Sequence, residues 1–178
     1  MVIDIGGGST EFVLGLREPE ASISLPLGCV RMTERHFERD PPANDELDAC
    51  IADVRERLVA VREVIDVGRA RRVVGLAGTV TTLSALTLGL THYDATRTHH
   101  SVLTRGAVET WFPRLAAANV ETRRTMLAEP GRAEVIVGGA AVLITILREL
   151  AIDELLVSEH DILDGLAGAL RAEQLHSR

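Results

Sequence analysis

The feature of this sequence that most constrains its fold is a short apolar run that leads directly into three glycines. Residues 2–5 (VIDI) predict a β-strand, and residues 6–8 (GGG) follow it without a spacer. Glycine has no Cβ, so such a turn can take positive φ angles and let a ligand approach the backbone closely. Consecutive N–H groups in a turn of this kind form a concave site for phosphoryl oxygens. We therefore predict that Gly6, Gly7 and Gly8 bind phosphate.

Polar residues beside this turn extend the predicted site. The hydroxyls of Ser9 and Thr10 can donate to phosphoryl oxygens, so both are predicted phosphate ligands. Asp4 ends its strand where it can hold Mg²⁺ or another divalent cation, and Glu11 lies across the turn as a second oxygen ligand or as a group that orients water. Asp4 and Glu11 are therefore the predicted catalytic and metal-binding residues. The alternative is a glycine-rich hairpin with two solvated carboxylates.

A second glycine-containing segment lies further along the chain. Residues 75–82 (GLAGTVTT) follow a predicted buried strand at 72–77 and open a predicted helix at 80–88. A helix N-terminus supplies free N–H groups and the positive end of the helix dipole, which suits a phosphate. We predict that Gly78 and Thr79 bind phosphate, although this segment alone also fits a helix start with Thr79 as N-cap. Two such segments, each at a strand end, favour a phosphate-binding cleft.

Two arginines are further candidates. Arg31 and Arg132 come shortly after glycines, and a guanidinium group can bind phosphate through two hydrogen bonds. We predict that both bind phosphate; the alternative is that they are surface or ion-paired residues. A metal cluster is also conceivable in a polar stretch, but the spacing of its residues fits no standard metal site and favours a polar loop. The residues of this stretch are His92, Asp94, His99 and His100.

The other elements are expected from hydrophobic periodicity and from glycine and proline. Strands are expected at 11–16 and 21–27, which complete an antiparallel meander, and at 155–157; helices are expected at 29–37, from Asp45 as N-cap through Val61, and at 105–118, 120–127, 133–150 and 162–171, with 91–101 polar and irregular. The order βββαβα, a helical insert and then βα is typical of one lobe of the actin-like and sugar-kinase-like ATPases. We therefore predict an α/β fold with a ribonuclease H-like mixed sheet (βββαβαβα), helices on both faces and a helical insert.

Length and composition limit the range of functions. The 178 residues fit a single domain, 1–178, and the formal net charge of -7 argues against sequence-independent nucleic-acid binding. Cys29 and Cys50 form neither a disulfide framework nor a metal-binding pair, which favours a reducing cytoplasm. Because of the net charge we expect no nucleic-acid partner. No run of residues is long and apolar enough to cross a membrane, so we expect no membrane partner either.

These segments together resemble the exopolyphosphatase and guanosine pentaphosphate phosphohydrolase (Ppx/GppA) family. Residues 4–11 (DIGGGSTE) are similar to the DIGGGS-E loop with which the second lobe of the family opens. Further similar patterns, which extend the resemblance over nearly all of the chain, are residues 27–34 (LGCVRMTE), 130–134 (PGRAE), 138–140 (GGA) and 158–165 (SEHDILDG). Two residues depart from the family pattern, because Glu134 replaces an expected Asp and Asp164 replaces an Arg found in many relatives.

The resemblance implies an enzyme of the exopolyphosphatase type, in which water attacks a terminal phosphorus of inorganic polyphosphate or guanosine pentaphosphate. It implies that this chain is the second lobe of a two-lobed phosphatase with Mg²⁺ as cofactor. The first lobe, expected before Met1, would carry another phosphate loop and the glutamate that activates water. We therefore expect the chain alone to hydrolyse neither substrate, and we include a homodimer formed through the exposed cleft wall among its expected assemblies.

Two other functions stay open. Residues 75–79 resemble the adenosine-side motif of ATP-dependent kinases and ATPases with this architecture, although the glycine loop fits the hydrolases better. The third hypothesis is a non-catalytic module that senses nucleotide or polyphosphate.

Overall fold

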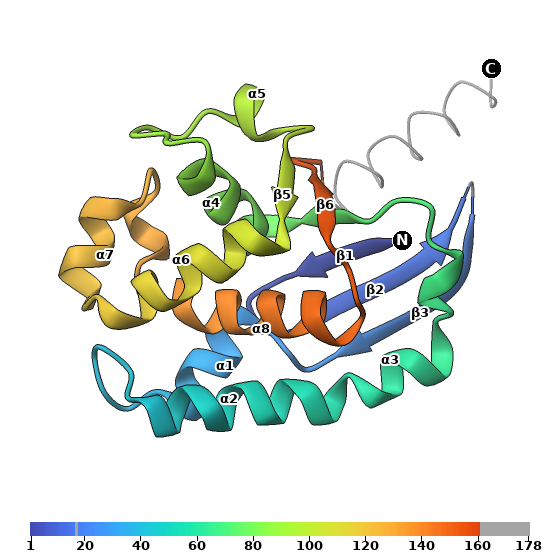
Figure 1. Cartoon of the computed structure of the whole chain (residues 1–178), viewed down its shortest axis with the longest axis horizontal. Helices are drawn as coiled ribbons and strands as arrows, with labels where there is room; N and C mark the ends of the chain where they lie inside the picture. The colour runs from blue at the N-terminus through green and yellow to red at the C-terminus, as the bar shows by residue number, and fades with distance from the viewer. Residues whose placement is uncertain (17, 161–178) are drawn as a thin grey trace, which may run out of the picture.

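The computed structural model describes residues 1–16 and 18–160. Its strands form one sheet in the order β3-β2-β1-β4-β6-β5 (Figure 1). They are β1 (Val2–Ile5), β2 (Thr10–Gly15), β3 (Pro19–Leu25), β4 (Val74–Leu76), β5 (Val102–Thr104) and β6 (Glu154–Val157). The first three form the predicted antiparallel meander, β4 runs parallel to β1 and β6, and β5 pairs antiparallel with β6. The sheet is therefore mixed, as predicted.

Helices fill the connections between the strands. Between β3 and β4 lie α1 (Cys29–His36), α2 (Asn44–Arg57), α3 (Val59–Val64) and the short 3-10 helix η1 (Val67–Arg69). α4 (Ala77–Thr87) follows β4, and the connection continues through α5 (Ala95–Thr98), β5, α6 (Arg105–Ala117), α7 (Val120–Met126), the 3-10 helix η2 (Pro130–Arg132) and α8 (Ile136–Glu149) to β6. The elements between α4 and α8 are the predicted helical insert.

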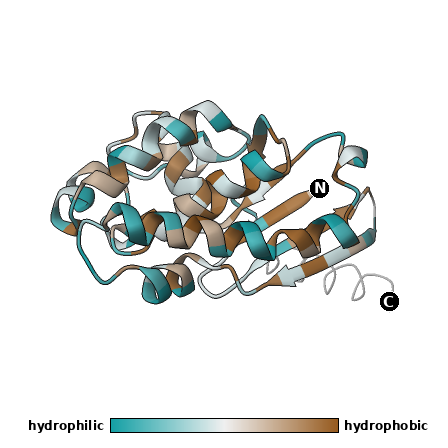
Figure 2. Cartoon of the chain, turned by 60° about the horizontal axis from the view of Figure 1, so that its bottom comes forward, coloured by the Kyte–Doolittle hydropathy of each residue, from teal (hydrophilic) through white to brown (hydrophobic). Residues whose placement is uncertain are grey.

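One face of the sheet and the helices against it enclose the core. Ile3, Ile5 and Phe12 are fully buried on this face, whereas Asp4 and Glu11 alternate with them and lie on the other face. α8 is the central helix, since it contacts α1, α2, α4 and α6 and buries nearly all of its side chains. Figure 2 shows the apolar strand β1 inside and hydrophilic residues on the outer turns of the helices.

Two glycines of α8 let neighbouring helices approach closely. A Cβ on Gly138 would lie 2.8 Å from the carbonyl oxygen of Cys29 in α1, and a Cβ on Gly139 would overlap the side chain of Thr79 in α4. Larger residues at these positions would push α1 or α4 away. α8 therefore sets the separation of the two helices that adjoin the predicted phosphate-binding segments.

The predicted start of α2 is wrong. α2 begins at Asn44, with Ala43 as its N-cap residue. The N–H group of Ala43 donates to the Glu46 carboxylate (2.8 Å), whereas Asp45 lies inside the helix and pairs with Arg39. Glu46, at the third helical position, therefore bonds back to the backbone of the N-cap residue, and Asp45 does not cap the helix.

Other elements differ in their bounds. The helix expected through Val61 is divided at Leu58 into α2 and α3, and α4 starts at Ala77 rather than at Val80. The stretch expected to be irregular contains α5, and β5 was not predicted because three residues with a single buried side chain carry no periodicity. The helix predicted at 162–171 lies outside the described residues. The prediction that helices cover both faces of the sheet is therefore not fully tested by the described elements.

Asp53 of α2 connects this helix to α1. Its carboxylate accepts hydrogen bonds from Arg35 (2.9 Å) and Arg57 (2.5 Å) and lies 3.0 Å from Nε2 of His36. Burial raises the pKa of Asp53, but the three partners together lower it by more, to about 2. The charged carboxylate therefore favours the folded state.

We expect Asp53 to make stability depend on pH in the acid range. Its folded-state pKa lies below the ordinary value of about 3.9, so the stabilisation is complete above that value and is lost as the pH falls toward 2. After allowance for solvent screening it amounts to about 1–2 kcal/mol. Urea unfolding should show Asp53→Asn to be less stable than the unsubstituted chain at about pH 6, with the difference shrinking toward about pH 2.

The matched control is Asp48→Asn, because Asp48 is exposed on the same helix and makes no ion pair with the described residues. It should leave the unfolding free energy nearly unchanged at both pH values. A pH-independent difference between Asp53→Asn and the unsubstituted chain would contradict the assignment of the pKa.

Candidate active site

The carboxyl ends of β1, β4 and β6 lie side by side and bring the predicted segments together. Asp4 of β1 is paired with Leu76 of β4, and the N–H group of Ser158, just after β6, donates to the carbonyl of Gly75 in β4 (2.9 Å). In open α/β sheets, ligands bind beyond the carboxyl ends of the strands. We call this region the carboxyl edge; it comprises residues 6–9, 77–78 and 158–159.

The glycine loop after β1 is held in place by the first turn of α1. The N–H groups of this turn donate to two loop carbonyls, from Cys29 to Gly6 (2.9 Å) and from Val30 and Arg31 to Gly7 (3.0 and 3.1 Å). In a trans peptide the N–H group points opposite to the carbonyl of the same unit. The N–H groups of Gly7 and Gly8 therefore point away from α1.

Three consecutive N–H groups of this loop have no acceptor among the described residues. They belong to Gly7, Gly8 and Ser9, whereas Gly6 donates to the Ser9 carbonyl (2.9 Å) and closes the turn. An uninterrupted set of outward N–H groups is the arrangement that binds phosphoryl oxygens in backbone nests. The N–H group of Gly6 is therefore used within the turn, while phosphate binding by Gly6, Gly7 and Gly8 stays a prediction.

The expected positive φ angles do not occur in this loop. Among the described glycines only Gly89 has a positive φ. A Cβ on Gly7 would first meet Val30 at 3.4 Å, and one on Gly8 would first meet Arg31 at 3.8 Å, so neither position is crowded by the protein. The absence of a Cβ at these positions therefore leaves open space beside the N–H groups rather than permitting a special backbone conformation.

Gly28 was missed by the sequence reasoning, and it is the glycine that the loop requires. A Cβ at this position would overlap the carbonyl group of Gly7 and the nitrogen of Gly8. Gly28 is also the N-cap residue of α1, with an extended φ of -111° that any residue can adopt. Glycine is required at this position for a steric reason. The requirement comes from a contact between two segments that lie about twenty residues apart in the chain. The similarity of residues 27–34 to the family included this position without giving a physical reason.

Arg31 lies beside the loop, as predicted. Its Nε group donates to the carbonyl of Gly8 (2.7 Å), and the side chain is otherwise exposed. The Nε group of Arg31 is used in this hydrogen bond, whereas its two Nη groups have no hydrogen-bond partner among the described residues. Arg31 therefore adds a cation next to the free N–H groups of the loop.

The two predicted metal ligands form a cross-strand pair. Asp4 and Glu11 are directly opposite in the β1–β2 ladder, so their Cβ atoms lie about 4.5–5.5 Å apart on the same face. Both are partly exposed. Oε1 of Glu11 accepts hydrogen bonds from the hydroxyls of Ser9 and Ser24, both at 2.6 Å. Ser24 was not predicted, because its strand becomes a neighbour of β2 only through the meander.

The carboxylate pair alone supplies too few ligands to enclose a metal ion. The described residues contain no cluster of three or more His, Cys, Asp or Glu side chains that could hold a metal. Mg²⁺, however, is often held by one or two carboxylates together with waters and substrate phosphates. Oxygen ligands next to a phosphate loop therefore fit a magnesium ion that binds together with the substrate.

Two predicted threonine ligands are turned into the core. Thr10 is buried opposite Ile5, and its hydroxyl donates to the carbonyl of Leu27. Thr79 lies within α4, is also buried and packs against Gly139 of α8. Neither hydroxyl faces the carboxyl edge. The predictions that Thr10 and Thr79 bind phosphate are wrong, and Thr79 is not an N-cap residue either.

Gly78 and Arg132 meet at the start of α4. A Cβ on Gly78 would overlap the guanidinium group of Arg132, so this side chain lies directly against the first turn of the helix. The side chain of Arg132 has no hydrogen bond or ion pair with the described residues. A cation at the positive end of a helix dipole is unfavourable unless an anion joins it. The arrangement therefore favours a bound anion at this point.

The backbone at this junction is strained. Ala77 has a φ of 66°, in the left-handed region that favours glycine, and it joins β4 directly to α4. The N-cap residue Leu76 provides no side-chain hydrogen bond to the helix. The first N–H groups of α4 are therefore left without a side-chain cap at the carboxyl edge.

Other sequence candidates lie elsewhere or have structural roles. Glu134, which replaces the Asp expected in the family, is exposed. Its carboxylate forms an ion pair with Arg124 (3.0 Å) and does not contact the carboxyl edge. Asp94 accepts a hydrogen bond from the N–H group of Thr96 and caps α5 (3.0 Å). The rings of His99 and His100 stack at 3.8 Å. Asp164 lies outside the described residues.

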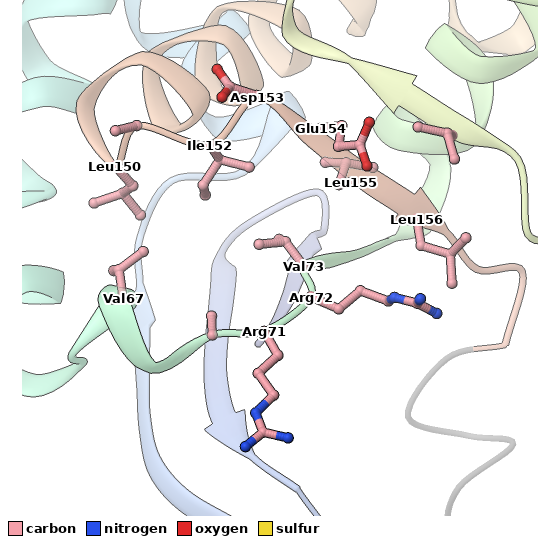
Figure 3. A pocket seen from close by; sticks show the side chains of 14 residues that line it. Val67, Arg71, Arg72, Val73, Leu150, Ile152, Asp153, Glu154, Leu155 and Leu156 are labelled. Carbon is pink, nitrogen blue, oxygen red and sulfur yellow. The ribbon is translucent and has the colours of Figure 1, made fainter.

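Two hollows differ in their position on the sheet. One of about 210 Å³ opens at the carboxyl edge and is lined by Gly78, Arg132 and Glu159 among others. A larger one, of about 690 Å³, is shown in Figure 3 and is lined by the segment with Arg71 and Arg72 and by the turn between α8 and β6. These residues precede β4 and β6, so the larger hollow lies at the opposite end of the parallel strands from the predicted site.

None of the helices described here has the length and apolar character that a membrane-spanning segment requires.

The chain is similar to proteins that hydrolyse phosphate compounds. The model of the Ppx/GppA phosphatase family matches residues 1–169. Exopolyphosphatase 2 of Mycobacterium tuberculosis is 46% identical over 175 residues, which are 96% of this chain and 55% of that protein. A guanosine-5'-triphosphate,3'-diphosphate pyrophosphatase of Aliivibrio fischeri is 36% identical over 90 residues, which are 49% of this chain and 18% of that protein.

Solved structures agree with these matches. The crystal structure of the Aquifex aeolicus Ppx/GppA phosphatase superposes with a TM-score of 0.85 at 35% identity, over 94% of this chain and 55% of that one. The chain spans about half the length of the Mycobacterium tuberculosis and Aquifex aeolicus proteins.

Proposed function

Because this chain belongs to the Ppx/GppA phosphatase family, we propose that it forms the phosphate-binding half of a hydrolase that releases terminal phosphate from inorganic polyphosphate or guanosine pentaphosphate. The observation that carries the proposal is the set of free N–H groups at Gly7, Gly8 and Ser9. Asp4 and Glu11 form a pair on the two strands that this loop joins, Arg31 donates to the carbonyl of Gly8, and Arg132 lies against Gly78. Neither arginine side chain has an ion pair with the described residues. Inorganic polyphosphate and the 5′ end of guanosine pentaphosphate both present a linear run of phosphoryl groups, which such an edge suits.

The residues of this chain would act mainly by positioning the substrate. The loop N–H groups and Arg31 would bind the phosphoryl group nearest the reaction, and Arg132 with the start of α4 would bind the next along the chain. Phosphoryl transfer depends on positioning and on neutralisation of the oxygens more than on covalent chemistry by the protein.

Asp4 and Glu11 would hold Mg²⁺ on the other side of the loop. When bound, the ion supplies further neutralisation of phosphoryl charge. Glu11 keeps its orientation through the hydroxyls of Ser9 and Ser24, which both donate to the same oxygen. Its second oxygen is then available to the metal or to the attacking water. We propose that the glutamate that activates this water belongs to the part of the family's length that this chain does not span.

A cytoplasmic location is part of the proposal and is supported by the two thiols. Cys29 and Cys50 are both buried and unpaired. Burial, with a smaller contribution from the nearby Asp53, raises the pKa of the Cys50 thiol to about 12. Buried neutral thiols of this kind are typical of proteins in reducing surroundings. The homodimer stays a prediction.

The proposal is tested first at the glycine loop. Gly7→Val places a branched side chain next to the free N–H groups, so we expect pyrophosphate to bind at least about tenfold more weakly in calorimetric titration. The fold should survive, because a Cβ on Gly7 first meets a side-chain carbon of Val30 at 3.4 Å.

Gly106→Val is the matched control for this change. Gly106 lies in α6, and a Cβ there meets no atom within 4 Å. This variant should bind pyrophosphate like the unsubstituted chain. If Gly7→Val also binds pyrophosphate with unchanged affinity, the loop is only a hairpin and the proposed phosphate site is wrong.

A further inference from the structure

We propose that the face of the sheet opposite the core is a docking surface for residues 161–178 of this chain, which cover it with apolar side chains. We call it the outer face; it is the face on which Asp4 and Glu11 lie. Docking at this face requires no phosphate at the carboxyl edge, so it is independent of the proposed function.

A row of apolar side chains crosses the outer face. Residues that are paired in neighbouring strands point to the same side of a sheet. Five such residues are paired in register across β2, β1, β4, β6 and β5, and we call this row the outer stripe: Val13, Val2, Val74, Leu156 and Val102. None of the five belongs to the hydrophobic core or packs against it.

The described chain leaves the outer stripe partly open to solvent. Four of its side chains are half-buried, and Val102 is 52% exposed. The helices that contact the strands, α3, α4, α6 and α8, bury their apolar residues in the core on the other face. A contiguous apolar surface of this kind marks a place where another segment or molecule binds.

The strands themselves indicate where a cover is required. Strands in the parallel part of a sheet are apolar on both faces when both faces are covered. β6, which pairs parallel with β4, follows this pattern, since Leu155 and Val157 are buried in the core while Leu156 lies on the outer face. β3, at the antiparallel edge, instead carries polar side chains on its outer face, Glu20, Ser22 and Ser24. The cover is therefore expected over the parallel strands rather than over β3.

The sequence after the described residues has the pattern that such a cover needs. Its apolar residues recur at the spacing of one helix face: Ile162, Leu163, Leu166 and Leu170. Asp164 and Arg171 fall on the opposite side of this pattern. An amphipathic pattern of this kind requires an apolar surface to pack on, and the outer stripe provides one.

The position and length of this segment fit the outer stripe. The described chain continues from Leu156 in the stripe to His160, a distance of about 13 Å along an extended chain. β6 lies between β4 and β5, so a chain that turns back after His160 meets the stripe near its middle. Ten helical residues, 162–171, would be about 15 Å long, and the stripe crosses four strand spacings, about 19 Å. The segment can therefore cover most of the stripe.

Thiol labelling of the 178-residue chain tests the docking. Val74→Cys places a thiol in the middle of the outer stripe, and the natural Cys29 and Cys50 are buried. A water-soluble maleimide should label this thiol at least about tenfold more slowly than in the variant that also carries Leu166→Glu, because a buried unpaired charge opposes docking. Val2→Cys, on the neighbouring strand β1, should show the same protection and repeats the test at a second position.

Two controls separate docking from general effects of the substitutions. Val59→Cys, which is 54% exposed on α3, should be labelled at the same rate with and without Leu166→Glu. Gly168→Glu adds the same charge on the opposite side of the apolar pattern and should leave Val74→Cys protected.

Three outcomes would overturn the proposal. The first is equal labelling of Val74→Cys and of Val2→Cys with and without Leu166→Glu, which would show that the segment does not cover the stripe. The second is equal loss of protection with Gly168→Glu and with Leu166→Glu, which would show that the apolar pattern is not what binds. The third is protection that increases with protein concentration, which would show that a second copy of the chain covers the outer face instead.

Discussion

Glu11→Gln and Asp4→Asn are each expected to lower turnover roughly 100-fold or more in an enzyme that combines this chain with the rest of the family's length. The two carboxylates are a cross-strand pair beside the free N–H groups, and we assign both to the metal and the attacking water. Neutralising either removes one of the two charges that we propose to hold Mg²⁺ close to the phosphates. Phosphate release from polyphosphate and from guanosine pentaphosphate measures the effect, and added Mg²⁺ should partly restore Asp4→Asn.

The folded state should tolerate both changes. Gln at position 11 keeps an oxygen that can accept the hydrogen bonds from Ser9 and Ser24. Both carboxylates are partly exposed, so we expect changes in unfolding free energy of about 0.5 kcal/mol. Glu34→Gln, on an exposed position of α1, is the control and should alter neither turnover nor stability. Lost stability together with intact turnover would show that the carboxylates are structural.

Gly28→Ala is expected to damage the proposed phosphate site more than an alanine substitution within the glycine loop does. A Cβ at position 28 overlaps backbone atoms of Gly7 and Gly8, and backbone cannot move aside as a flexible side chain can. We expect a loss of stability of about 1–3 kcal/mol from overpacking. Because the displaced atoms carry the free N–H groups, affinity for pyrophosphate should fall more than about tenfold.

Gly7→Ala is the matched comparison for this variant. Its Cβ lies 3.4 Å from the side chain of Val30, which can shift by a few tenths of an ångström. This change should leave the stability nearly unaltered. Urea unfolding and calorimetric titration of both variants decide the question, and native-like stability of Gly28→Ala would show that the loop and α1 are not held as closely as the structure indicates.

The sequence by itself determined the local parts of the site. Alternation and glycine placed β1, the loop and β2 in consecutive order, because a strand, a turn and the next strand are specified by neighbouring residues. The same local pattern predicted that Asp4 and Glu11 lie across the turn from one another, and the register of β1 and β2 confirms that placement. The α/β class and the mixed sheet also followed from the order of the elements.

Which groups face the ligand was decided only by tertiary structure. Thr10 and Thr79 carry the right chemistry, but the faces of β2 and α4 that bear them pack into the core. Gly6 uses its N–H group to close the turn, so the free set begins one residue later. These outcomes depend on how helices pack on the sheet, which a local sequence pattern does not contain.

The contacts that assemble the site join segments far apart in the chain. This is the physical reason why the sequence pattern predicted the local elements but not which groups face the ligand. Gly28 lies against the loop because α1 returns across the end of β1, and Gly138 and Gly139 matter because α8 packs between α1 and α4. Arg132 reaches Gly78 across more than fifty residues of chain. Local propensity specifies each element, but the steric fit between elements exists only once they are packed. The sequence therefore determined the parts of the candidate phosphate site, and the tertiary structure determined their arrangement.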